Sequence, residues 1–298
     1  MQFDHKHAEA LLAVIDSGSF EQAASALHLT ASAVSQRVRQ LEVQLGVPLL
    51  VRSRPCRATM AGQQLLQYLR RARLLEQDFL ASFSGEAAAP LTVPLAVNAD
   101  TLSTWLLPAL SDFLIAENVL ISLTVDDQDH TYALMQEGQA LACVSAEPHA
   151  MQGCVVHELG ILRYRMLASP AFHARWFARG YTRDAARQAP VMVFNRKDAL
   201  QAGFLEQQFG LRVGAYPEHH VPASEPYLQS ILLGLGCGMV PHLQADPLIA
   251  RGELIDLAPQ QPTDVTLYWH HWKVQSPRLE RLSRRLVEAA RGALLARV

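Results

Sequence analysis

The chain has 298 residues, of which half are hydrophobic and 18% are charged, a balance that excludes an intrinsically disordered protein. Its net charge is −2 and its pI is about 6.6, so the average charge gives no sign of a nucleic-acid partner. The N-terminus lacks the basic and apolar stretches of a signal peptide, and no run of eighteen apolar residues follows. We therefore expect a cytosolic protein of about two domains. Four widely separated cysteines predict buried thiols rather than disulfides or a zinc site: Cys56, Cys143, Cys154 and Cys237.

The first 46 residues show the apolar spacing of three short helices. The first helix spans about Asp4 to Ser17, the second follows a capping box at Ser19, and the third runs from an N-cap at Thr30 to Gly46. A short turn between the second and third helices is typical of a helix-turn-helix, whose second helix enters the major groove of DNA. The polar face of the third helix carries groups suited to bases or phosphates: Ser32, Ser35, Gln36, Arg37, Arg39 and Gln40.

A basic hairpin follows these helices. Residues 49–52 and 56–58 have the pattern of two short strands around a turn, where Arg52 and Arg54 would meet backbone phosphates. Eight arginines between Ser35 and Arg73 face a single acid, so this segment alone carries a net charge of +7. A solvated charged face would give the same composition, and three-helix bundles that do not bind DNA share the apolar spacing.

From Thr59 to about Phe83 the sequence predicts one long helix. Its apolar stripe cannot be buried by a lone helix, so it must pack on its own protein or on a second copy of the chain. Dimeric helix-turn-helix proteins read paired half-sites, which favours the second copy. The candidate dimerisation residues are Leu65, Leu69, Ala72 and Phe79.

After a small-residue linker at 86–90, strands and helices alternate. Alternation of this kind predicts an α/β fold with mainly parallel sheets and a ligand crevice beyond the carboxyl ends of the strands. Two such sets indicate two lobes. The expected strands are 91–97, 119–125, 140–144, 163–168, 191–194 and 238–240, and the expected helices are 103–117, 130–138, 201–209 and 226–235.

The sequence offers little support for catalysis or metal binding. The glycine-rich stretch 234–238 follows a helix and precedes a strand, the reverse of a dinucleotide-binding loop, so we interpret it as a turn. Neighbouring histidines at 219–220 and 270–271 would point to opposite faces of a strand and could not chelate one ion together. No nucleophile elbow, phosphate loop or HExxH motif occurs. The arginines of the C-terminal helix are expected to form a solvated face: Arg278, Arg281, Arg284, Arg285 and Arg291.

Segments 19–42, 45–52 and 59–62 resemble the winged helix-turn-helix of LysR-type transcriptional regulators. Further along the chain, 95–100, 104–110, 241–244, 252–257 and 267–270 are similar to the arginine- and lysine-sensing ArgP/LysG branch of that family. One departure is Ala31, where the family often has a polar residue. A methyl group there can touch a thymine methyl but cannot hydrogen-bond a base.

The resemblance implies a division of the chain into a winged helix-turn-helix at 1–60, a linker and dimerisation helix at 61–88, and an effector-binding domain at 89–298. This last domain would be bilobal, like a periplasmic binding protein. Lobe I would comprise about 91–162 and 268–298, and lobe II about 163–267, with the chain crossing near Leu162 and Leu267.

An amino-acid effector needs donors for its carboxylate, an acceptor for its ammonium group and, where its side chain is basic, a second acid. Helix N-termini supply such donors, and the sequence places helix starts near Thr101 to Thr104 and near Ser224. Acids for the cationic groups are Asp100, Asp126, Asp127 and Glu225. Helix caps and solvated loop acids would have the same residue types. The candidate effector-binding residues are Asn98, Asp100, Thr101, Ser103, Asp127, Ser145, Asn195, Glu225 and His242.

The resemblance implies a regulator that binds double-stranded operator DNA as a dimer or tetramer and changes its DNA contacts when arginine or lysine binds. Its target would be an exporter gene for these amino acids, which it would activate, with RNA polymerase as a further partner. No cofactor, metal or membrane contact is expected. Two alternatives stay open: a regulator of this family with a different effector, and a solute-binding protein or enzyme on a bilobal fold.

Overall fold

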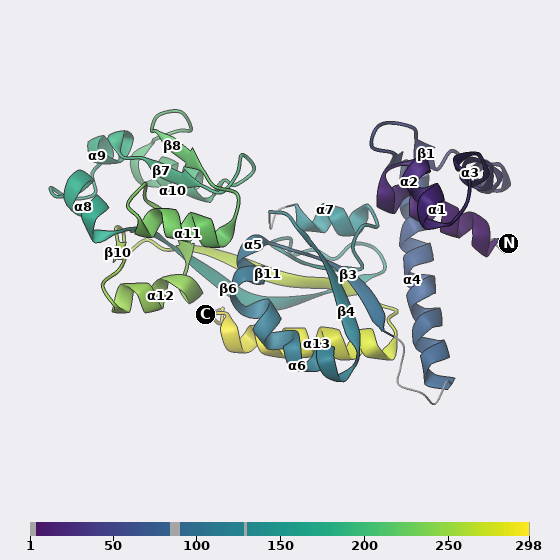
Figure 1. The fold of residues 1–298 in the computed structure, drawn as a ribbon. Helices are drawn as coiled ribbons and strands as arrows, with labels where there is room; N and C mark the ends of the chain where they lie inside the picture. The colour runs from purple at the N-terminus through teal and green to yellow at the C-terminus, as the bar shows by residue number, and fades with distance from the viewer. Residues whose placement is uncertain (1–3, 84–89, 128–129, 298) are drawn as a thin grey trace.

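The computed structural model describes residues 4–83, 90–127 and 130–297, so the linker expected at 86–90 lies, apart from Pro90, outside the described residues. Three helices and a two-stranded hairpin form the N-terminal part (Figure 1). Asp4, Ser19 and Thr30 accept hydrogen bonds from backbone N–H groups at the three helix starts, as their residue types predict. The elements are α1 (His5–Ser17), α2 (Phe20–Ala26), α3 (Ala31–Leu45), β1 (Leu50–Val51), β2 (Arg57–Ala58) and α4 (Met60–Phe83).

The inward faces of α1, α2 and α3 form one hydrophobic core with the first turns of α4. Leu11, Val34 and Val38 are fully buried there, and Leu65 and Leu66 of α4 complete it. The chain reverses between α1 and α2 at Gly18, whose φ of 70° few L-residues adopt. A Cβ atom at this position would lie 2.9 Å from the Cβ of Pro55, so the hairpin turn also requires glycine here.

A seven-stranded mixed sheet organises the rest of the chain. Its strand order is β10-β6-β11-β5-β3-β4, with β9 paired to β6. The expected parallel pairing holds for β3, β4 and β5, but β6, β9, β10 and β11 pair antiparallel. The strands are β3 (Leu91–Val97), β4 (Val119–Val125), β5 (Ala142–Ser145), β6 (Cys154–Ala168), β9 (Gly238–Pro241), β10 (Ile255–Asp256) and β11 (Thr263–Trp272).

The long antiparallel pair β6 and β11 runs from one lobe into the other (Figure 1). In lobe I, α6 and α13 lie along one side of the sheet and α7 lies on the other. Lobe II gathers its helices around β9 and a separate parallel pair, β7 (Val191–Val193) and β8 (Glu218–His220). The helices of the two lobes are α5 (Ala99–Thr101), η1 (Leu102–Leu106, π-helical), α6 (Leu107–Ala116), α7 (Thr131–Gln136), α8 (Pro170–Trp176), α9 (Arg183–Gln188), α10 (Leu200–Phe209), α11 (Ser224–Leu232), α12 (His242–Ala250) and α13 (Pro277–Ala293).

The structure corrects several boundaries. The helix expected from residue 103 already begins at Ala99, which places Asn98 at its N-cap. The strand expected near 163–168 begins at Cys154, because it continues through lobe I before crossing. The elements α8, α9, α12, β8 and β10 were not expected, and each is nine residues long or shorter, which leaves little periodicity to detect. The ten-residue strand β11 was not among the expected strands either. None of the described helices is long and apolar enough to cross a membrane.

The long helix α4 packs against both parts of its own chain. Its N-terminal turns belong to the helix-turn-helix core, whereas Leu74 joins the core of lobe I. Further contacts with lobe I come from the guanidinium of Arg71, which lies 3.9 Å from the centre of the Trp272 ring, and from an ion pair between Asp78 and Arg278. Its exposed large apolar side chains are Met60 in the first turn and Tyr68, Phe79 and Leu80 further along.

Arg278 corrects the expectation of a solvated C-terminal helix face. Its side chain is 6% exposed and pairs with Asp78, whose own side chain is 7% exposed. Arg281 is also engaged, because its Nε donates to Glu117 at 3.1 Å. Arg284, Arg285 and Arg291 are exposed, as expected. The error arose because the partner Asp78 lies 200 residues away in the sequence.

Candidate functional site

Helix α3 presents its polar face to solvent. Val34, Val38 and Leu41 are buried on its inner side, which turns the predicted contact residues outward. Of these, Ser32, Gln36 and Arg39 are exposed, while Ser35 and Arg37 are partly exposed. On the hairpin Arg52 and Arg54 are exposed, and the guanidinium of Arg52 lies 5.2 Å from the ring centre of Phe20 at the start of α2. The polar face of α3 and the basic hairpin are therefore both exposed, and their chemistry suits a DNA groove and its phosphates.

A cleft of about 510 Å³, partly open to solvent, lies between the lobes. Its lobe I wall comes from residues just after the carboxyl ends of β3 and β4, where an α/β sheet is expected to bind ligands. Its lobe II wall comes from the β7 loop and from α10, α11 and β9. The lining residues are Asn98, Ala99, Asp100, Asp126, Asp127, Tyr164, Phe194, Asp198, Leu200, Gln201, Ser224, Tyr227, Met239, Pro241 and Gln244.

Asp100 belongs to lobe I, and its carboxylate is hydrogen-bonded to lobe II. Its carboxylate accepts hydrogen bonds from the Tyr164 hydroxyl at 2.7 Å and from the Ser224 hydroxyl at 3.2 Å. Burial raises the pKa of Asp100, and the negative charges of Asp198 and Asp127 raise it further, against the lowering effect of the two hydroxyls. A cation placed in the cleft would relieve this repulsion.

The other carboxylates of the cleft are Asp126, Asp127 and Asp198. Burial raises the pKa of Asp198, although the backbone N–H groups of Leu200 and Phe194 donate to it at 3.0 and 3.4 Å. Four carboxylates thus line the cleft, and its described lining contains no lysine, arginine or histidine. Such a lining favours a cationic ligand.

Buried acceptors add to this preference. The side-chain oxygens of Asn98 and Gln201, both in the cleft lining, are buried and have no hydrogen-bond partner among the described residues. Buried polar atoms are normally paired, so each can accept a hydrogen bond from a ligand. The Gln201 amide nitrogen, by contrast, already donates to the Tyr227 hydroxyl at 2.7 Å.

The structure brings some of the predicted effector residues together and separates others. Asn98, Asp100 and Asp127 line the cleft. Thr101 is fully buried behind the lining, and the Ser103 hydroxyl lies 3.1 Å from that of Ser224 at the edge.

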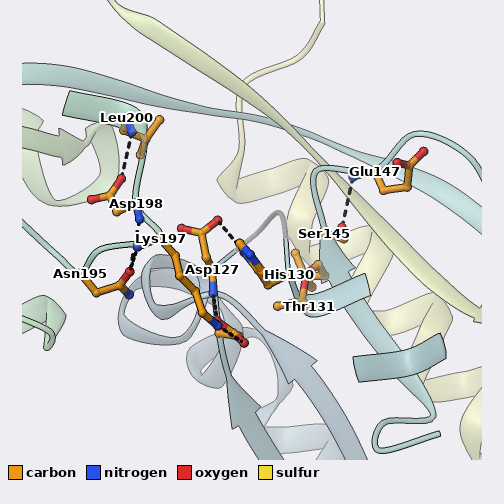
Figure 2. Close-up of polar contacts among 11 residues, drawn as sticks. Asp127, His130, Thr131, Ser145, Glu147, Asn195, Lys197, Asp198 and Leu200 are labelled. Carbon is orange, nitrogen blue, oxygen red and sulfur yellow. Dashed lines mark hydrogen bonds and ion pairs between the residues drawn. The ribbon is translucent and has the colours of Figure 1, made fainter. Parts of the chain in front are cut away.

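The remaining predicted residues lie outside the lining. The Asn195 side chain holds the backbone of the β7 loop, and the Ser145 hydroxyl accepts from the Glu147 N–H, away from Asp127 (Figure 2). Glu225 is exposed. His242 accepts the backbone N–H of Arg163 at 3.3 Å, a contact that joins α12 to β6.

Several lining residues were missed by reasoning from the sequence. Tyr164 and Tyr227 lie inside a strand or helix rather than at its end, so no terminal pattern marks them, and Gln201, the second residue of α10, was also missed. Asp198 could have been found, because it follows β7 in the same way that Asp100 follows β3.

Comparison with known proteins places the chain in a family. Residues 5–63 match the bacterial regulatory helix-turn-helix protein family of lysR type, and residues 88–291 match the LysR substrate binding domain. The chain belongs to the LysR family. A transcriptional regulator named ArgP from Aeromonas salmonicida is 41% identical over 292 residues, which cover 98% of each chain.

Solved LysR-type structures agree in fold as well as in sequence. ArgP from Mycobacterium tuberculosis is 39% identical with a TM-score of 0.85, over 99% of this chain and all of that one. LysG from Corynebacterium glutamicum, solved with bound effector Arg, is 35% identical with a TM-score of 0.77, over 98% and 100%. The expected family and α/β architecture are therefore confirmed. These relatives are named as transcriptional regulators, which agrees with the expectation that the chain is not an enzyme.

The histidines at 270–271 and the buried cysteines, which the sequence did not link to metal binding or catalysis, have structural roles. His270 lies 2.7 Å from the Glu147 carbonyl and His271 lies 3.1 Å from the His157 ring. The part of the chain that the structure describes contains no group of three or more His, Cys, Asp or Glu residues able to hold a metal ion. Burial raises the pKa of Cys154 and of Cys237 to about 12, so both thiols stay protonated.

Proposed function

We propose that the inter-lobe cleft binds a basic amino acid, arginine or lysine, and that binding changes how the helix-turn-helix surface contacts operator DNA. The carrying observation is that the lining, as far as the structure describes it, holds four carboxylates and no basic side chain. The relative LysG with bound Arg supports the same ligand class.

Within the cleft the two ends of the ligand have different partners. Asp100 and Asp198 would hold the α-ammonium group deep between the lobes, and Asp126 and Asp127 would hold the side-chain cation. The α-carboxylate would lie at the N-terminus of α11, where the N-cap residue Ala223 makes no side-chain capping bond and the first N–H groups can donate to an anion. The buried oxygens of Asn98 and Gln201 would accept from the two cationic ends.

Coupling to DNA follows from the elements between the two sites. The cleft joins lobes I and II, and lobe I is fixed to α4, which continues from the helix-turn-helix. A ligand that prefers one arrangement of the lobes shifts the equilibrium toward it, in proportion to its differential affinity. The exposed Tyr68, Phe79 and Leu80 would pair α4 with a second chain, together with the predicted Ala72.

We also propose the finer assignments that the family likeness suggests. The domains would divide after residues 60 and 88, and the protein would act in the cytoplasm as a dimer or tetramer. Its target would be an exporter gene for basic amino acids, which it would activate through RNA polymerase. Predicted Leu65 and Leu69 pack in the helix-turn-helix core, so the partner contact would rest mainly on the second half of α4.

Fluorescence anisotropy with the DNA upstream of the chain's own gene and of its neighbours tests this function. Arginine or lysine should change the affinity or the footprint for one of these fragments, and glutamate at the same concentration should not. A response to glutamate with none to either base would contradict the proposal. Loss of response in Asp127→Asn, with DNA affinity retained, would assign the effect to the cleft.

A further inference from the structure

A lysine from lobe II is bound to one of the cleft acids of lobe I. The Nζ atom of Lys197 donates to both carboxylate oxygens of Asp126, at 2.8 and 2.9 Å (Figure 2). Asp126 follows β4 and lines the cleft, whereas Lys197 lies in the loop after β7. The side chains are 25% and 50% exposed, so the pair bridges the two lobes at the solvent-facing edge of the cleft.

The backbone around Lys197 is held in place independently of this ion pair. The Asn195 side-chain oxygen accepts from the N–H groups of Lys197 and Asp198, at 2.7 and 3.2 Å. Asp198 in turn accepts from the backbone of Leu200 and Phe194. Only the flexible side chain of Lys197 must therefore rotate to free Asp126. Because this side chain is half-exposed, its ammonium group can move into solvent.

We propose that Lys197 is a tethered competitor of the effector: its ammonium group occupies the carboxylate that receives the cationic side chain of a basic amino acid, and the ligand must displace it. The proposal rests on the proposed function of the cleft. The chemical reason is that Lys197 carries the same ammonium group as free lysine. Its Nζ atom already occupies both oxygens of Asp126. A guanidinium fork pairs with a carboxylate through two parallel hydrogen bonds, so arginine should displace Lys197 better than lysine does.

A different role for the same contact would change arginine affinity in the opposite direction. If the Lys197 pair served to hold the lobes closed around a ligand, its removal would weaken binding. The partners of two other cleft acids favour competition: Asp100 accepts from two hydroxyls and Asp198 from two backbone N–H groups, which stabilise their positions without adding positive charge. Lys197 alone among these contacts brings a full positive charge, and it neutralises an acid that a cationic ligand needs.

Titration calorimetry with arginine on the full chain tests the proposal. Exposed ion pairs contribute up to about 1 kcal/mol, so Lys197→Met should bind arginine up to about fivefold more tightly than wild type. Its affinity for citrulline, which has the shape of arginine without the charge, should not change. Lys197→Arg should stay near wild type. The matched control is Arg196→Met, which removes the same charge from the exposed neighbouring residue and should leave arginine affinity unchanged.

A second variant assigns the effect to the ion pair. In an Asp126→Asn background, Lys197→Met should no longer tighten arginine binding, because the two substitutions remove the same interaction. Unchanged or weaker arginine binding by Lys197→Met would overturn the inference and leave the proposed function standing, provided that wild type binds arginine. Failure of wild type to bind either base would overturn both.

Discussion

Removing one partner of the buried ion pair between α4 and α13 should strongly destabilise the chain. In Asp78→Asn the Arg278 guanidinium, 6% exposed, would lose its anion inside the interface. The carboxylate also accepts the backbone N–H of Arg278 at 3.2 Å, so a second bond changes as well. Removing one partner of a buried pair costs about 3–5 kcal/mol, because the remaining charge stays buried without compensation. At roughly 2–4 °C per kcal/mol for a domain of this size, the thermal midpoint should fall by roughly 6–20 °C.

Thermal unfolding monitored by circular dichroism measures this loss. The exposed pair of Arg251 and Glu253 provides a control, since Arg251→Met should change stability by less than about 1 kcal/mol. Replacing both partners, as Asp78→Leu with Arg278→Met, should recover most of the loss because no unpaired charge remains. If Asp78→Asn lost no more stability than the Arg251 control, the assignment of a buried ion pair at this interface would be refuted.

Three further predictions concern stability, pH and DNA. Gly238→Ala should destabilise the chain by about 1–3 kcal/mol in urea denaturation, because its Cβ would lie 2.3 Å from the Tyr227 hydroxyl oxygen; equal stability would show that lobe II repacks freely. Burial would raise the pKa of Asp78, but its hydrogen bonds with the side chain and the backbone N–H of Arg278 outweigh this and hold the pKa below its usual range. The stability that depends on its charge is therefore present above the unfolded-state pKa, about 3.9, and is lost as pH falls through the lower folded pKa, so the gap between wild type and Asp78→Asn should narrow in acid. Arg52→Ala should weaken DNA binding and reduce the magnitude of its salt-dependence slope by about one unit in anisotropy titrations at several salt concentrations; an unchanged slope would remove Arg52 from the phosphate contacts.

Local signals predicted the N-terminal part well. Ser19 and Thr30 cap the starts of α2 and α3, and Gly18 and Gly46 end α1 and α3 with positive φ, so each of these boundaries depends on residues within a few positions of it. The same reasoning located the acids after β3 and β4, because residues that follow neighbouring parallel strands meet at one edge of a sheet.

Contacts between distant segments could not be predicted in this way. Tyr164 reaches Asp100 across 64 residues, and Lys197 reaches Asp126 across 71. Both contacts depend on how the two lobes face each other, which is set by the long antiparallel pair β6 and β11. The contact of Arg278 with Asp78 was missed for the same reason, since the pattern of the C-terminal helix gives no sign of an acid on α4.

Calorimetric titration of the wild-type chain with arginine, and in parallel with citrulline, tests the acidic cleft most directly. The two ligands differ in side-chain charge and scarcely in shape. Hydrogen bonds to charged groups contribute about 1.5–3 kcal/mol, so arginine should bind at least about tenfold more tightly than citrulline. Equal affinities for the two ligands, or tighter binding of glutamate than of arginine, would contradict the assignment of the cleft to a basic amino acid.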